Sequence, residues 1–78
     1  MGIRPTGVAV RQVHLRDRAG AEADLRARWT NVAAIGAGDT WSHKGVEYDA
    51  VVVDAIAMDP SELYLAASRA AHELVVAG

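Results

Sequence analysis

The sequence contains no cysteine and no phenylalanine, and only two prolines among its 78 residues. Without cysteine the chain has neither disulfides nor thiolate metal sites, which agrees with a reducing compartment. No apolar run approaches the roughly 20 residues of a membrane-spanning helix, and the first residues lack the apolar core of a signal peptide. We therefore expect a cytoplasmic protein with no membrane partner.

The chain also lacks a positive charge excess and the motifs of a complete nucleotide site. Its formal net charge is −2, so any contact with nucleic acid has to be local. Gly36-Ala37-Gly38 lacks the third glycine of a dinucleotide-binding loop and the Gly-Lys-Ser/Thr ending of a Walker loop, and we expect a flexible turn there. No Asp-Glu pair closes a strand to hold magnesium.

The apolar residues that are present favour an α/β fold. Hydrophobic residues make up 51% of the chain, but sixteen of them are alanine and most of the large ones are valine or leucine. Valine favours strands and alanine favours helices. A chain of this length forms one small domain, residues 1–78, or a piece of a larger one. We expect Tyr48 and Tyr64 to lie in the core.

The first half predicts a strand over residues 8–15, with a bulge or an exposed edge at Arg11-Gln12, and a helix over about 21–29. Acidic and basic residues four apart, Glu22 with Arg26 and Asp24 with Arg28, indicate a solvated helix face. His14 and His72 are expected to face solvent. Residues 31–35 form either a short strand or the tail of the helix.

The second half predicts a strand-helix-strand unit. The apolar run 50–53, ended by Asp54, is typical of a central parallel strand. Asp59, Pro60 and Glu62 are a helix-start signal, and the helix is expected to continue through residue 71 before a strand at 74–76. We expect a small three-layer α/β sandwich, with a mainly parallel sheet of about four or five strands and about two or three helices.

Two segments resemble a known family. Residues 44–53, Lys-Gly-Val-Glu-Tyr-Asp-Ala-Val-Val-Val, resemble helicase motif V, and residues 63–70, Leu-Tyr-Leu-Ala-Ala-Ser-Arg-Ala, resemble motif VI. The family is the superfamily 1 DNA helicases of the UvrD and Rep type, in particular the helicase IV-like branch. The resemblance implies an abbreviated RecA-like (P-loop NTPase-like) second domain, the C-terminal one of the motor.

The resemblance also implies roles for individual residues. Arg69 matches the arginine that reaches the γ-phosphate across the cleft between two RecA-like domains and is catalytic there. Lys44, Gly45 and Glu47 match the nucleotide-facing loop of motif V. The nucleic-acid contact falls on three consecutive residues, Thr40, Trp41 and Ser42. The family often has Thr-x-His at this point, whereas this chain has Asp39-Thr40-Trp41, so Trp41 either stacks on a base or packs in the core.

The expected function follows from this resemblance. ATP with magnesium would be held mainly by the first motor domain, which this chain lacks, so the isolated chain is expected to bind no cofactor and to hydrolyse no ATP. Its expected partners are that N-terminal motor domain, in cis or in trans, and single-stranded DNA in the full enzyme. Two alternatives remain: a degenerate helicase-derived binding or interaction module, and a plain α/β folding unit without a ligand.

Overall fold

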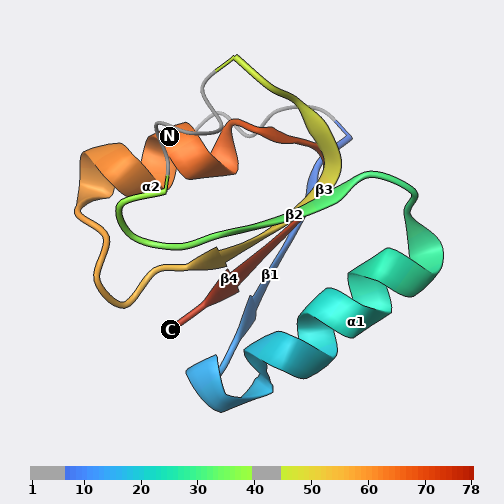
Figure 1. Cartoon of the computed structure of the whole chain (residues 1–78), viewed down its shortest axis with the longest axis horizontal. Helices are drawn as coiled ribbons and strands as arrows, with labels where there is room; N and C mark the ends of the chain where they lie inside the picture. Colours follow the sequence, from blue (N-terminus) through green and yellow to red (C-terminus); the bar gives the residue numbers. More distant parts are fainter. Residues whose placement is uncertain (1–6, 40–44) are drawn as a thin grey trace.

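A computed structural model describes residues 7–39 and 45–78 and contains one four-stranded sheet (Figure 1). The strands lie in the order β1-β4-β3-β2, and every pair of neighbours is parallel. Their bounds are Ala9–Val13 for β1, Val32–Ile35 for β2, Tyr48–Asp54 for β3 and Ala70–Ala77 for β4. Because the strands are parallel, their first residues all lie at one edge of the sheet, which we call the amino edge.

One helix covers each face of the sheet, which gives three layers (Figure 1). Helix α1 spans Arg18–Arg28 and follows a short 3-10 helix, η1, at Leu15–Asp17. Helix α2 spans Pro60–Ala67 and connects β3 to β4 on the opposite face. The expected small three-layer α/β sandwich with a parallel sheet is confirmed, and its layering agrees with a small RecA-like arrangement.

Strand β3 is the centre of the core, as the valine run predicts. Val51 and Val53 face α2 and pack with its buried Ala66, while Ala50 and Val52 face α1 and pack with its Leu25. The valines are at most 1% exposed. Complete burial of a valine side chain contributes about 1.5–3 kcal/mol, so this short run is a large share of the stability of a small domain.

The predicted start of α2 is confirmed, but its predicted end is wrong. Asp59 caps the helix by accepting a hydrogen bond from the Glu62 N–H over 2.8 Å, and Pro60 is the first helical residue. The helix ends at Ala67, however, and β4 already begins at Ala70. Alanine favours a helix here, yet parallel pairing of β4 with both β1 and β3 outweighs that local preference.

Some of the other expectations for the fold are confirmed and others are wrong. Residues 32–35 are a strand, and α1 begins at Arg18, earlier than predicted. Strand β1 pairs with β4 without a register shift, so it is an exposed edge strand without the bulge. Tyr48 packs against the core, but Tyr64 is 74% exposed, because α2 places it on its outer side. None of the helices in the described ranges has the length and apolarity to cross a membrane.

Candidate functional site

Arg69 lies in the turn between α2 and β4, at the amino edge of the sheet. Its Nε donates to the Leu65 carbonyl over 3.2 Å, and one Nη donates to Ser68 Oγ over 3.1 Å. The Ser68 hydroxyl in turn donates to the same Leu65 carbonyl over 2.7 Å. These bonds hold the half-buried side chain against the last turn of α2, and its other N–H groups have no partner among the described residues.

The charge of Arg69 is not neutralised within residues 7–39 and 45–78, where it forms no ion pair with a carboxylate. Most other arginines in these ranges do form such pairs, namely Arg11, Arg18, Arg26 and Arg28. Arg16 resembles Arg69 in this respect, but it lies beyond the end of β1, at the opposite edge of the sheet. Arg69 is therefore the ion-pair-free cation of the amino edge among the described residues.

A backbone hydrogen bond joins the two segments that resemble helicase motifs. The Tyr48 N–H, at the start of β3, donates to the Arg69 carbonyl over 2.7 Å. The Arg69 N–H donates to the Ala66 carbonyl over 3.1 Å, which closes the turn after α2. Parallel pairing of β3 with β4 thus brings Tyr48, the first residue of β3, beside Arg69 although the two segments are far apart in sequence.

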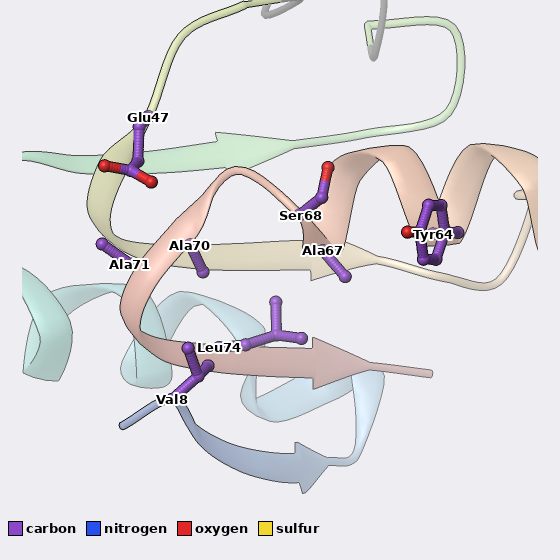
Figure 2. A pocket seen from close by; sticks show the side chains of 8 residues that line it. All are labelled: Val8, Glu47, Tyr64, Ala67, Ser68, Ala70, Ala71 and Leu74. Carbon is purple, nitrogen blue, oxygen red and sulfur yellow. The ribbon is translucent and has the colours of Figure 1, made fainter. Parts of the chain in front are cut away.

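Gly45 and Glu47 lead into β3 at this edge. Gly45 has a φ of 78°, a conformation that a residue with a side chain adopts only with strain. Glu47 is exposed, and its carboxylate borders a shallow hollow of about 370 Å³ (Figure 2). In Figure 2, Glu47 and Tyr64 lie at opposite ends of this hollow, with Ala67 and Ala70 between them.

The hollow has a mostly apolar floor with polar groups at its rim. The apolar residues come from α2, from β4 and from the position just before β1, namely Tyr64, Ala67, Ala70, Ala71, Leu74 and Val8. The polar groups are the Glu47 carboxylate and the Ser68 hydroxyl. Arg69 does not line the hollow, but its guanidinium bonds Ser68 at the rim. A ligand here would meet an apolar surface, a hydrogen-bond acceptor and a nearby cation.

The remaining predicted site residues lie outside the described part of the chain. These are Lys44 of the predicted nucleotide loop and the predicted DNA contacts Thr40, Trp41 and Ser42. Among the residues that are described, no group of three or more His, Asp or Glu side chains is placed to hold a metal ion. For a nucleotide, this part of the chain therefore offers Arg69 and Glu47, and no ligand set for magnesium.

No protein-family model, curated protein or solved structure matches this chain. The family resemblance accordingly rests on the two sequence motifs. The geometry adds that Glu47 and Arg69 lie at the same edge of the sheet.

A second polar cluster, on the α1 face of the sheet, was not predicted from the sequence. Glu73 of β4 accepts hydrogen bonds from Arg28 at 2.6 and 2.9 Å and from Trp29 Nε1 at 2.9 Å. The bonds from Arg28, with that from Trp29, hold the pKa of Glu73 below its usual value and outweigh the opposing effect of burial. His72 stacks on the Trp29 ring at 5.1 Å between centroids, so it is exposed as predicted but is not isolated.

A register irregularity explains how two consecutive strand residues reach the same tryptophan. Between the pairs Tyr48–Ala70 and Ala50–Glu73, β4 contains one residue more than β3. Such an extra residue turns neighbouring side chains toward the same face, so that His72 and Glu73 both contact Trp29. The signal in the sequence was a histidine and a glutamate directly before the predicted strand 74–76, but their partner could not be identified without the fold.

Proposed function

We propose that this chain supplies the C-terminal part of a superfamily 1 helicase motor, in which Arg69 completes a nucleotide site held mainly by another domain. The observation that carries the proposal is the backbone hydrogen bond between Arg69 and Tyr48, the residue that follows the Gly45–Glu47 segment. Within the described ranges the Arg69 guanidinium has no carboxylate partner. A guanidinium stays charged at working pH, so a cation left without a counterion suits an anionic ligand.

Arg69 would act on the phosphate end of the nucleotide. Its planar donors can bond phosphate oxygens and stabilise the charge that develops during transfer to water. The bonds to Leu65 and Ser68 orient the guanidinium before the ligand arrives, which reduces the cost of ordering it. Glu47 can accept a hydrogen bond from a sugar hydroxyl at the same edge. Magnesium and most phosphate contacts belong to the other domain in this proposal.

The test is DNA-stimulated ATP hydrolysis by this chain joined to the N-terminal motor domain of a helicase of the same type, in cis or in trans. Arg69→Ala is expected to reduce turnover by about 10³- to 10⁵-fold, as for other arginine fingers. The matched control is Arg16→Ala, which removes another arginine without an ion pair in the described ranges, at the opposite edge of the sheet, and should leave turnover unchanged. Turnover that survives Arg69→Ala would exclude the motor role.

The hollow favours a second candidate, a helicase-derived binding module without ATPase activity. Its apolar floor and the exposed Tyr64 ring can receive an apolar side chain of a protein partner. A partner whose binding survives Arg69→Ala and Glu47→Ala but is lost with Tyr64→Ala would favour this module over the motor. Loss of binding in the Arg69→Ala variant would argue against it.

A further inference from the structure

Strand β1 is an outermost strand of the sheet, and the side of it that faces away from β4 is exposed. It pairs with β4 on one side, and no strand of the described chain lies on its other side. Four of its five residues are exposed, and Val10 is 49% exposed. The opposite edge strand, β2, differs because three of its four residues are buried. An exposed edge presents unpaired N–H and C=O groups that can pair with another strand.

The direction of these groups follows from one hydrogen bond. Gly78, just after β4, donates its N–H to the Val13 carbonyl over 3.2 Å, so the main-chain groups of Val13 face β4. Alternate residues of a strand share a direction, so Ala9 and Arg11 also face β4. The main-chain groups of Val10 and Gln12 therefore point away from the sheet, toward open space in the described structure.

The features that commonly block edge pairing are scarce in β1. The strand contains neither proline nor lysine, and its pairing with β4 is regular, without a bulge. Its one charged residue, Arg11, extends over the α1 face, where it forms an ion pair with Asp24 at 3.4 Å. Val10 and Val8 lie on the other face, which α2 covers only in part, and Val8 lines the hollow.

The strand is also complementary to itself in one register. If two copies run antiparallel with Val10 opposite Val10, each Arg11 lies opposite an Ala9 and each Gln12 opposite a Val8. A shift that centres the pair on Arg11 would place two like charges opposite each other, which is destabilising. A shift that centres it on Ala9 leaves only the two Val8–Val10 pairs of the described residues to exchange main-chain hydrogen bonds, about four bonds instead of about six.

We propose that β1 pairs with β1 of a second copy of this chain, antiparallel about a twofold axis at Val10. The pairing joins two four-stranded sheets through about six main-chain hydrogen bonds and covers the exposed face of Val10. It also places Gln12 of the second copy beside Val8, so each copy adds a polar side chain to the rim of the other's hollow. This association is independent of the proposed role of Arg69.

Sedimentation equilibrium of the 78-residue chain tests the association. One short strand buries less than the roughly 800 Å² per partner of a standard interface, so we expect a dissociation constant on the order of 10–100 μM. Val10→Lys should weaken the dimer at least about tenfold, because it sets two like charges opposite each other. Val46→Lys changes another exposed valine, outside the strand, and should leave the dimer intact. A wild-type chain that stays monomeric up to about 1 mM would overturn the proposal.

Cysteine cross-linking tests the register, since the chain has no cysteine of its own. In the proposed register, Val10 lies opposite Val10 of the second copy in a hydrogen-bonded antiparallel pair. The Cα atoms of such a pair are about 5.5 Å apart, which is within the range of a disulfide. Val10→Cys should therefore form a covalent dimer on mild oxidation, whereas Gln12→Cys should not. Cross-linking through Ala9→Cys instead of Val10→Cys would show a different register and contradict the proposed axis. Circular dichroism establishes that each variant is folded.

Discussion

Glu73 connects β4 to α1, and its replacement by glutamine is the sharpest test of how the two layers are held together. Its side chain is only 12% exposed and accepts hydrogen bonds from Arg28 and from the Trp29 indole, with Arg11 4.0 Å away. Glutamine has nearly the same shape and can still accept from Trp29. Glu73→Gln therefore removes the negative charge with little change in packing.

The expected loss of stability follows from the hydrogen bonds whose acceptor is no longer a charged carboxylate. Hydrogen bonds with a charged partner contribute about 1.5–3 kcal/mol net, against about 0.5–1.5 kcal/mol for neutral ones. The difference predicts that Glu73→Gln lowers the free energy of unfolding by about 1–2 kcal/mol at neutral pH. A chain of this length is stable by only about 4–12 kcal/mol, so urea unfolding followed by circular dichroism can resolve that change.

The direction of the Glu73 pKa shift determines how the effect of Glu73→Gln changes with pH. The pKa of Glu73 is lower in the folded chain than in the unfolded chain, so its stabilisation is present above the unfolded pKa. It is lost as the pH falls through the folded value, where the wild-type carboxylate takes up a proton. The wild-type and Glu73→Gln unfolding free energies should therefore converge as the pH is lowered. Their difference is the useful quantity because the other carboxylates titrate in both proteins.

The matched control is Glu22→Gln, which also removes one glutamate charge. Glu22 pairs with Arg18 and Arg26 on the surface of α1, in helical pairs worth about 0.2–0.5 kcal/mol each. Glu22→Gln should thus lower the free energy of unfolding less than Glu73→Gln does. Equal losses in the two variants, or a Glu73→Gln difference that does not change with pH, would refute a stabilising charge at Glu73.

Two further predictions concern stability, and urea unfolding measures both. Leu25→Ala should lower the free energy of unfolding by about 2–5 kcal/mol, because Leu25 is fully buried between α1 and β3. The control Val46→Ala changes an exposed site and should lower it little. A loss below about 1 kcal/mol for Leu25→Ala would mean that α1 is not packed as described. Asp59→Ala should cost about 1 kcal/mol through loss of the α2 cap, and Asp59→Asn should restore most of it, so equal losses in both variants would argue against the cap.

Local signals predicted much of the fold. The valine run identified the central strand, since a parallel strand buried on both faces typically has continuous β-branched apolar residues. Asp59 and Pro60 located the start of α2, because capping depends on residues that are neighbours in sequence. The end of α2 was misplaced because β4 already begins at Ala70, which pairs with Tyr48 of β3, a residue distant in sequence.

For the candidate site, too, some features were predicted from the sequence and others required the tertiary structure. The sequence by itself predicted Arg69 and Glu47 as nucleotide-site residues, through the resemblance of two segments to helicase motifs, and this stays a prediction. Only the tertiary structure decided that Arg69 lies beside the start of β3 and that Glu73 bonds Arg28 across the layers. It also decided that Tyr64 is exposed. The physical reason is that burial and pairing depend on strand order and register, which result from contacts between segments distant in sequence.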